Sequence, residues 1–428
     1  MRAHRNRGRR VIVVGGGPAG LMAAGTAAAR GAQVILLERN PDVGRKLLIT
    51  GNGRCNFTND TDVDGLVAGM PGNGRFLYSA FSRLDSTGLR AFFRSLGVES
   101  RVEGEGRVFP FSGVGRDVLG ALTTYARKNG VETRCAWKAE RIYVKDGKVR
   151  GVIAGRIPDR PGLISCDAAI IATGGITYPM TGSTGDGYAM AAGVGHTIVP
   201  PRAALVPLEV SEPWVDGLAG LALRGVTVRS VVSSRTLETE FGDMLFTHFG
   251  VSGPAILALS REIALAVAQG EGPVNIVIDL KPDLTLPGLD EHIRRALDRY
   301  FKRRIQNALF DLVPIALAPV IIREAGILET RPVSHITREE RLSLGRVLKG
   351  LALTVTKTRP DEEGIVTAGG VSVGEIDPRT MESKLVEGLY FAGEVIDVDG
   401  RTGGFNLQAA FSTGYVAGFS AAARGGTH

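Results

Sequence analysis

Three glycines near the start of the chain have the spacing of a dinucleotide-binding turn. Gly15, Gly17 and Gly20 form a G-x-G-x-x-G motif between the apolar residues 11–14 and an alanine-rich run, a pattern that predicts a strand, a tight turn and a helix. In such a turn the first glycine allows the sharp bend, the second lets the backbone approach a pyrophosphate, and the third allows close packing of helix on strand. The helix N-terminus would offer free N–H groups and a partial positive charge to that diphosphate.

An acidic residue lies at the distance expected for ribose recognition. The apolar residues 34–37 predict a second buried strand, which ends in Glu38. A carboxylate at this position accepts hydrogen bonds from an adenosine ribose, and an acid rather than a base favours a ribose without a phosphate, as in FAD or NAD. The alternative is an ordinary strand–turn–helix unit that binds no nucleotide.

A stretch rich in glycine and asparagine, residues 44–59, follows the predicted ribose-binding strand. Its small residues would let backbone N–H groups face a ligand, while Lys46 and Arg54 add positive charge. We therefore expect this stretch to wrap around a cofactor. A purely structural Ω-like loop is the alternative.

A second strand–glycine–helix sequence occurs near the C-terminus. Residues 388–394 predict a buried strand, residues 397–404 are rich in glycine, and residues 409–422 predict a helix of small side chains. Because a helix N-terminus carries partial positive charge, a helix that begins there can stabilise negative charge on a flavin ring. Between the two sequences, the apolar residues 168–171 run into Ala-Thr-Gly-Gly, an ending typical of a strand that closes the nucleotide-binding half of a flavoprotein.

Length and composition place the chain among ordinary globular proteins. Its 428 residues are enough for two or three domains, and 44% hydrophobic with 22% charged residues is typical of soluble proteins. No apolar run reaches the ~18 residues of a membrane span. The basic residues 1–10 look like an export signal, but cleavage after them would remove the nucleotide motif. We therefore expect a short disordered arm on a cytoplasmic protein with no membrane partner.

Cysteine number and net charge limit the chemistry further. Cys55, Cys135 and Cys166 contain no C-x-x-C pair, which excludes a disulfide framework, a zinc ribbon and the dithiol of disulfide reductases; we expect no metal site. The net charge of +7 favours polyanionic partners such as nucleic acid, although a coding bias towards arginine would give the same excess. A basic cluster is expected to be a solvated helix face: Lys302, Arg303 and Arg304.

The composition changes near Pro200 and Pro201. Beyond these prolines, three alternating segments predict the antiparallel strands of a barrel or sandwich: 205–210, 226–232 and 274–280. Residues 282–351 then predict helices, one of which would begin at Thr337, and the chain returns to strand at 352–356. This order indicates an inserted domain that itself contains a helical segment.

Together these stretches resemble the YhiN/BaiN-like family of FAD-dependent oxidoreductases over nearly the whole chain. The resemblance rests on the joint occurrence of several motifs. They are the G-x-G-x-x-G helix, Gly-Arg-Lys-Leu-Leu with Gly-Arg-Cys-Asn, Ala-Thr-Gly-Gly, Tyr-Pro before Gly-Ser-Thr-Gly-Asp-Gly, Thr-His-Phe-Gly-Val-Ser-Gly-Pro, Ala-Gly-Gly-Val and Gly-Gly-Phe-Asn-Leu-Gln. The resemblance implies an α/β fold: a Rossmann-like FAD-binding domain of the two-dinucleotide-binding-domain flavoprotein type, split by an inserted β-barrel domain that carries a helical insert.

The resemblance also gives domain boundaries, with which the changes in composition agree. The FAD-binding domain is expected to contain residues 1–199 and 365–428. The barrel would contain residues 200–281 and 349–364, and the helical insert would contain residues 282–348.

A set of cofactor-binding residues follows from the same resemblance. The glycine turn and Glu38 would hold the dinucleotide, the loop around Lys46 would lie near the flavin, and Glu394 would hold ribityl hydroxyls. The complete set of expected FAD contacts is Gly15, Gly17, Pro18, Ala19, Gly20, Glu38, Arg39, Lys46, Asn52, Gly53, Arg54, Cys55, Asn56, Thr173, Gly174, Gly393, Glu394, Gly404, Phe405, Asn406 and Leu407.

The resemblance further implies reduction of an activated C=C bond with NAD(P)H, with FAD carrying the hydride and a side chain or water delivering the proton. The candidate catalytic proton donors are Cys55, Tyr178 and His248. A structural thiol and a packing histidine are the alternatives for Cys55 and His248, and His196 is expected to be structural. Because no second G-x-G-x-x-G occurs between a strand and a helix, NAD(P)H would bind only transiently, at the flavin face or the barrel surface, or another donor would replace it.

Three function classes stay open at this point. The first is a reductase of a small conjugated or ring substrate. The second is a flavin-dependent RNA-modifying enzyme that converts a uridine of ribosomal RNA to dihydrouridine, which the basic residues favour. The third is a non-catalytic FAD-binding redox sensor, which the flavin-facing motifs disfavour. The sequence does not determine the oligomeric state or the choice between NADH and NADPH.

Overall fold

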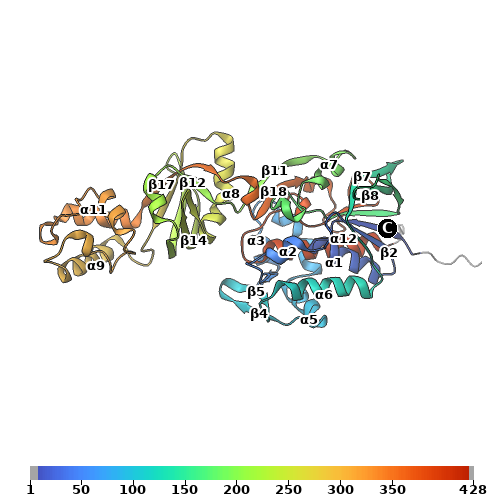
Figure 1. Cartoon of the computed structure of the whole chain (residues 1–428), viewed down its shortest axis with the longest axis horizontal. Helices are drawn as coiled ribbons and strands as arrows, with labels where there is room; N and C mark the ends of the chain where they lie inside the picture. The colour runs from blue at the N-terminus through green and yellow to red at the C-terminus, as the bar shows by residue number, and fades with distance from the viewer. Residues whose placement is uncertain (1–7, 424–428) are drawn as a thin grey trace, which may run out of the picture. The chain divides into compact units, whose positions relative to one another are not determined.

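The computed structural model describes residues 8–423, so residues 1–7 of the expected N-terminal arm lie outside the described part. The chain forms two compact units (Figure 1). The first unit contains Met1–Ala203 and Gly364–His428, and the second contains Ala204–Glu363. A segment from the end of the chain therefore completes the unit in which the chain begins.

A five-stranded parallel sheet lies at the centre of the first unit. Its strand order is β19-β10-β1-β2-β6, and every neighbouring pair is parallel. Parallel strands are covered on both faces and need apolar side chains throughout, as in β1, where Val11 to Val14 are all buried. The order, with β1 in the middle, is that of a Rossmann-type sheet and confirms the predicted fold class. The strands are β1 (Arg10–Val14), β2 (Gln33–Glu38), β6 (Glu132–Cys135), β10 (Ala168–Ile171) and β19 (Leu389–Phe391).

The first and last helices of this unit pack against each other (Figure 1). They are α1 (Pro18–Ala29) and α12 (Phe405–Ala422). A Cβ at Gly414 would overlap the carbonyl oxygen of Ala19, and one at Gly418 would overlap that of Ala23. These two glycines therefore let the helix backbones approach closely, which holds the C-terminal segment in the first unit. Helix α12 begins four residues earlier than the predicted start at residue 409.

Smaller elements surround the central sheet. The region 75–97, predicted to be helical, is divided into short helices because Asp85 caps a new one: its carboxylate accepts a hydrogen bond from the Gly88 N–H at 2.7 Å. The helices are α2 (Arg45–Ile49), α3 (Val63–Ala68), α4 (Tyr78–Arg83), α5 (Ser86–Ser95), α6 (Gly115–Lys128) and α7 (Asp186–Ala192). The strands are β3 (Thr58–Asn59), β4 (Ser100–Glu103), β5 (Arg107–Pro110), β7 (Trp137–Lys145), β8 (Lys148–Arg156), β9 (Gly162–Ser165), β11 (Ile198–Ala204) and β18 (Val366–Val371).

The second unit is built on a closed antiparallel barrel. Its order is β12-β15-β14-β13-β16-β17, and β12 pairs with both β15 and β17, which closes the ring. The strands are β12 (Leu208–Val210), β13 (Ala222–Val232), β14 (Arg235–Thr247), β15 (Gly250–Ser252), β16 (Val274–Asp279) and β17 (Leu351–Thr358). The helices are α8 (Pro254–Gln269), α9 (Leu286–Arg299), α10 (Ala318–Glu324) and α11 (Arg338–Lys349).

Helix α11 begins where the sequence predicts. The Thr337 hydroxyl accepts a hydrogen bond from the Glu340 N–H at 3.2 Å, and the Glu340 carboxylate accepts one from the Thr337 N–H at 2.8 Å. This reciprocal pair is a capping box and satisfies two N–H groups that a helix start leaves unpaired.

The prediction for Lys302, Arg303 and Arg304 is wrong. They do not lie on a helix face but in a turn after α9, because the helix ends at Arg299. Within residues 8–423, no helix combines the length and the apolar character needed to cross a membrane.

Candidate functional site

The glycine turn after β1 has the geometry of a dinucleotide site. Gly15 has a φ of 106°, and a Cβ there would overlap the carbonyl oxygen of Ala172. A Cβ at Gly20 would overlap the carbonyl oxygen of Gly15. At Gly17, by contrast, no atom lies within 4 Å of an added Cβ. Packing therefore requires glycine at positions 15 and 20, whereas Gly17 borders open space.

Helix α1 begins beside that open space. Gly17 is its N-cap residue, Pro18 occupies its first turn, and no side chain caps it. The first N–H groups of an uncapped helix are available to a ligand, and the aligned peptide dipoles favour an anion there.

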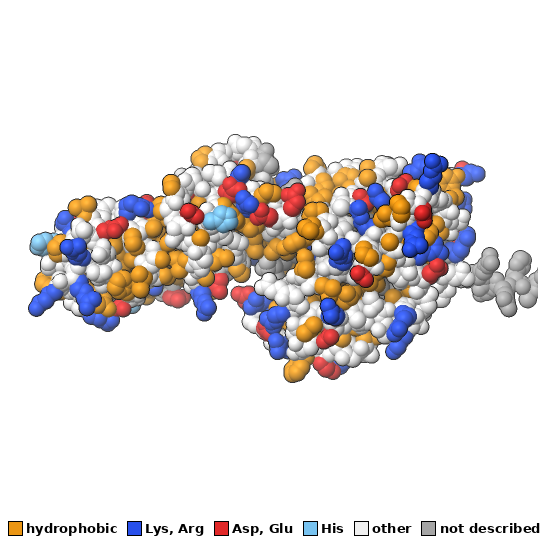
Figure 2. All heavy atoms as spheres, in the orientation of Figure 1, with side chains coloured by type: hydrophobic (Ala, Val, Ile, Leu, Met, Phe, Trp, Pro, Cys, Tyr) orange, Lys and Arg blue, Asp and Glu red, His pale blue; other side chains and the backbone are white. Residues whose placement is uncertain are grey.

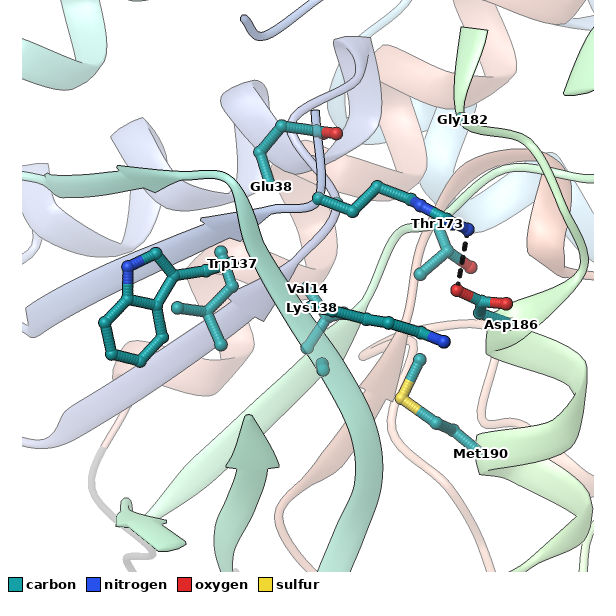
Figure 3. Close-up of a pocket in the computed structure, with 12 residues that line it drawn as sticks. Val14, Glu38, Trp137, Lys138, Thr173, Gly182, Asp186 and Met190 are labelled. Atoms are coloured by element: carbon teal, nitrogen blue, oxygen red, sulfur yellow. Dashed lines mark hydrogen bonds and ion pairs between the residues drawn. The ribbon is translucent and has the colours of Figure 1, made fainter. Parts of the chain in front are cut away.

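A pocket opens at the carboxyl ends of β1 and β2 (Figure 3). The start of β7, Thr173 two positions after β10, Gly182 and helix α7 complete its wall. One polar atom in this wall has no partner, because the Thr173 hydroxyl oxygen is buried without a hydrogen bond. A buried hydroxyl that is left unpaired is destabilising, so this atom is a place where a polar ligand group would be stabilised. Gly174, next in the chain, turns the backbone with a φ of 74°.

Glu38 ends β2 at this pocket and is held firmly. One carboxylate oxygen accepts a hydrogen bond from the Gly16 N–H at 2.7 Å, and the other accepts two from Asn40 at 2.8 Å. The residue is 7% exposed. An ionised carboxylate has about four acceptor positions, so it can still accept a hydrogen bond from a ligand hydroxyl.

Two cations lie at the same pocket in different states. Arg39 is paired with Asp186 at 2.9 Å and also donates to Thr184. Lys138 has no ion-pair partner among the residues that the structure describes, and its side chain extends towards Asp186 and Met190 (Figure 3). The pocket thus offers one neutralised and one free positive charge.

A polar junction joins four separate segments of the first unit. Lys46 Nζ lies 2.9 Å from one carboxylate oxygen of Glu394 and 3.1 Å from the other, and it donates to the Thr177 hydroxyl at 2.8 Å. Glu394 also accepts a hydrogen bond from the Thr367 N–H at 2.7 Å. Lys46 and Glu394 are each 21% exposed. The structure therefore brings together two predicted cofactor residues that are 348 positions apart.

The loop after α2 is also held by charges and rings. Arg54 stacks on Phe109, with its guanidinium carbon 4.1 Å from the ring centre, and it forms an ion pair with Glu103. Asn56 accepts a hydrogen bond from the Val108 N–H at 3.2 Å. Asn52 is exposed and has a φ of 55°, and Gly53 follows it with a φ of 81°.

Cys55 does not have the environment of a proton donor. Its side chain is fully buried in the hydrophobic core. Burial raises the pKa of the thiol to about 12, and a hydrogen bond with Thr50 lowers it only in part. This burial favours the structural-thiol alternative for Cys55 over the role of a proton donor.

The start of α12 lies beside the same loop. Gly404 caps this helix with a φ of 99°, and a Cβ there would overlap the carbonyl oxygen of Thr58. The Asn406 side chain bonds both the N–H and the carbonyl of Gly400, at 2.8 and 2.7 Å, so it fixes the preceding loop. Phe405 and Leu407 are partly buried in the first turn. No side chain caps α12, so its N–H groups are available as well.

Gly393 links this region to the glycine turn. Its N–H donates to the Thr413 hydroxyl of α12 at 2.9 Å, and a Cβ at Gly393 would lie 2.8 Å from the Ala19 Cβ of α1. The ends of β1 and β19 and the helices that follow them therefore form one packed assembly. Pro18, Ala19 and the other predicted positions of the turn belong to it.

The remaining proton-donor candidates lie in different units. Tyr178 belongs to the first unit, is partly exposed, has a φ of 54°, and lies with its ring centre 6.0 Å from Lys46 Nζ. His248 belongs to the second unit, where it is exposed in the turn between β14 and β15 and contacts the Phe249 ring. His196 is buried and bridges Glu375 at 3.0 Å and Ser383 at 2.8 Å, which is a structural arrangement.

Sequence reasoning missed part of the pocket wall. Trp137 and Lys138 begin β7, about a hundred residues after β2, and neither carries a motif. Thr177 and Thr367 complete the polar junction but are ordinary threonines in the sequence. Only the folding of distant segments onto the sheet reveals these four residues.

Known proteins resemble this chain over nearly its full length. A family model described as the HI0933-like protein Rossmann domain matches residues 9–420. The "3-dehydro-bile acid delta(4,6)-reductase" of Clostridium scindens is 33% identical over 97% of this chain and 99% of its own. The "Ribosomal RNA dihydrouridine synthase" of Haemophilus influenzae is 31% identical over 96% of this chain and 97% of its own.

A solved structure shares the fold at low identity. The 3-ketosteroid-delta4-(5alpha)-dehydrogenase of Rhodococcus jostii RHA1 matches with a TM-score of 0.53 and 15% identity, over 99% of both chains. At this identity the likeness concerns the fold alone.

Proposed function

This chain belongs to the HI0933-like Rossmann family of flavoprotein oxidoreductases, and we propose that it binds FAD and uses NAD(P)H to reduce an activated C=C bond. One observation carries the proposal. Gly17 borders open space at the uncapped start of α1, while Glu38 ends the neighbouring strand with a fixed carboxylate. A diphosphate binds at an uncapped helix start such as that of α1, and a ribose binds a carboxylate at the end of the next strand, about 20 residues further along the chain.

The residues fit FAD on further grounds. The buried Thr173 hydroxyl in the pocket has no hydrogen-bond partner in the described structure. A polar group of a bound nucleotide would provide one. The adenosine would lie in the pocket beside Glu38, and the diphosphate would lie at the start of α1. The flavin would lie near the uncapped start of α12 and the Lys46–Glu394 junction. An extended dinucleotide needs such a series of sites.

When bound, FAD supplies two-electron transfer between a nicotinamide and a conjugated C=C bond. The names of two relatives support this choice of bond. A 3-dehydro bile acid with Δ4,6 unsaturation has double bonds conjugated to its 3-carbonyl. The uracil ring of a uridine has a C=C bond conjugated to a carbonyl as well. The shared chemical feature is an unsaturated carbonyl, whose carbon skeleton accepts a hydride at one position and a proton at the next.

Within this proposal we assign to Tyr178 the donation of the proton to the substrate. Its phenol is partly exposed beside Lys46, whereas Cys55 is buried. Lys46 is neutralised by Glu394, so it orients the junction rather than donating a proton itself. Tyr178→Phe should lower turnover of an enone about 100-fold while the rate of flavin bleaching by NAD(P)H stays unchanged.

The experiment that tests the function starts from the purified protein. We expect a yellow protein whose released cofactor co-elutes with FAD, and whose visible absorbance is bleached anaerobically by NADH or NADPH. Addition of a cyclic enone should then restore the absorbance. Protein that stays colourless after incubation with excess FAD would refute the proposal. Bleaching without reoxidation by any unsaturated carbonyl would favour the redox-sensor alternative.

A second candidate is reduction of a uridine in ribosomal RNA. It is favoured by the match to a ribosomal RNA dihydrouridine synthase over 96% of this chain and by three adjacent exposed cations of the second unit, Lys302 to Arg304, which form no ion pair within the described residues. Mass spectrometry of ribosomal RNA from a deletion strain tests it. Loss of one dihydrouridine would support this candidate, and unchanged modification would leave the small-molecule substrate.

A further inference from the structure

A segment with three adjacent cations directly follows α9 in the second unit. It is here called the basic turn and contains Tyr300, Phe301, Lys302, Arg303 and Arg304. Phe301, Lys302, Arg303 and Arg304 are all exposed, and Phe301 has 57% of its surface in solvent. The segment therefore presents three adjacent cationic side chains and an aromatic one to solvent.

The backbone of the basic turn is anchored rather than loose. The Arg303 N–H donates to the Tyr300 carbonyl at 2.8 Å, and the Arg303 carbonyl accepts from the Val333 N–H at 2.9 Å. The next residue, Ile305, is fully buried, and its N–H donates to the Arg331 carbonyl at 2.9 Å. An anchored turn loses little backbone entropy when its side chains bind a partner.

The basic turn carries three adjacent cations that no carboxylate offsets within the described part of the chain. Among the residues that the structure describes, no ion pair involves Lys302, Arg303 or Arg304. Five arginines of the same helical region are paired: Arg294 and Arg295 with Glu291, Arg299 with Asp311, Arg331 with Glu340, and Arg341 with Asp290. Within the described residues Arg338 and Arg346 of α11 also form no ion pair, but neither is adjacent in the sequence to another cation. Three adjacent uncompensated charges repel one another and attract a polyanion.

Aromatic rings accompany these charges. The Arg303 guanidinium carbon lies 5.7 Å from the centre of the Tyr300 ring, and the exposed Phe301 ring is free to stack. Figure 2 shows Lys and Arg side chains interspersed with hydrophobic ones over the region of α9 and α11. Cations that follow a phosphate backbone, combined with rings on which bases stack, are the requirements for binding single-stranded nucleic acid.

We propose that the basic turn is a docking surface for single-stranded RNA. This proposal rests on the second candidate function, in which the substrate is a uridine of ribosomal RNA. An anionic membrane is disfavoured because membrane-surface binding requires an amphipathic segment with a broad apolar face, whereas the basic turn exposes one phenylalanine among three charges. The turn holds the RNA, and the first unit carries the redox chemistry.

The test compares two triple variants of the full-length protein. Lys302→Gln/Arg303→Gln/Arg304→Gln removes three unpaired cations, and Arg294→Gln/Arg295→Gln/Arg299→Gln removes three paired cations from the adjacent helix. Both variants change the net charge equally. Binding to a fluorescent oligouridine of about 16 nucleotides is measured by anisotropy between about 50 and about 200 mM salt.

We expect the first variant to bind oligouridine at least about tenfold more weakly and to lower the salt slope by about 2, because each phosphate contact contributes about 0.7. The second variant should change affinity less than about threefold. Phe301→Ala should weaken binding about fivefold without changing the salt slope. Circular dichroism on each variant verifies that α9 is intact.

Three results would overturn the proposal. They are equal loss of affinity in both triple variants, absence of oligouridine binding by the unmodified protein, and tighter binding to phosphatidylserine vesicles than to oligouridine. The flavin spectrum is recorded on the same samples. A colourless protein that still binds oligouridine through the basic turn would refute the redox function alone, and a yellow protein without RNA binding would refute only the docking surface.

Discussion

Two parts of the first unit hold the proposed cofactor site by different forces. The glycine turn from Gly15 to Gly20 is a matter of steric fit, because a side chain at either end would overlap backbone atoms. The Lys46–Glu394 junction is a matter of charge, because one ion pair and its hydrogen-bond partners join segments 348 positions apart. The spacing of the glycines can be read from a short stretch of sequence even though one of the atoms they make room for, the Ala172 carbonyl oxygen, comes from a distant strand end. The partner of Lys46, by contrast, is known only from the residue that lies opposite it in space.

The largest expected effect is that of Gly20→Ala. The new Cβ would overlap the Gly15 carbonyl oxygen, so backbone must shift, and we expect a loss of about 3 kcal/mol or more in the free energy of unfolding together with loss of flavin. Chemical denaturation followed by circular dichroism measures it. The matched control is Gly17→Ala, whose Cβ meets no atom. It should keep the stability of the flavin-free protein and lower only the affinity for FAD, about tenfold or more; a control as unstable as Gly20→Ala would contradict the steric account.

A smaller loss is expected at the polar junction. Lys46→Met leaves Glu394 without its cation, and because both groups are only 21% exposed, we expect the free energy of unfolding to fall by about 2 kcal/mol. Glu394→Gln should cost a similar amount, and the double variant should lose less than the sum, with a coupling of about 1 kcal/mol. Denaturation of the four proteins in the cycle measures the coupling. Additive losses would show that the ion pair does not join the two segments energetically.

The smallest effect concerns a second junction, between His196 and Glu375. Burial lowers the pKa of His196 below its ordinary value, and hydrogen bonding to Glu375 offsets this only in part. The unfolded chain therefore takes up the proton first, and stability should fall as pH decreases below about 6.5, by at most about 1.4 kcal/mol per pH unit. For Glu375, burial acts to raise the pKa, but hydrogen bonds from Thr197 and His196 lower it overall, so its contribution is lost only at more acidic pH.

Thermal unfolding between about pH 7 and about pH 5 measures this dependence. His196→Gln should flatten the fall in Tm over that interval. His335, which is exposed, provides the control: His335→Gln should leave the slope unchanged. If both variants retain the slope of the unmodified protein, another group is responsible for the loss of stability in acid.

Much of the fold was predictable because its signals are local. The apolar run of β1 and the glycines after it lie within a few residues of one another, and the structure has the strand, turn and helix that they predict. The capping box at Thr337 is equally local. The helical region 75–97 was predicted less well, because a single capping aspartate at position 85 interrupts its apolar periodicity.

The functional site was less predictable where the role of a residue depends on its burial and its neighbours in space. Cys55 stands in a motif that favours a role at the flavin, yet its neighbours in space bury it completely. Lys138 carries no motif, yet β7 brings it to the pocket. The cluster at residues 302–304 was expected on a helix, and the end of α9 at Arg299 places it in a turn.

Local sequence is sufficient to define the glycine turn, the acidic end of β2, the family and the alternation of strand and helix. These depend on backbone conformation and apolar periodicity, which residues a few positions apart dictate. Which charges are neutralised depends on the three-dimensional arrangement: Lys46 is paired with Glu394, whereas Lys302 to Arg304 form no ion pair among the described residues. The physical reason is that pairing and desolvation depend on groups across space, and the chain order does not record them.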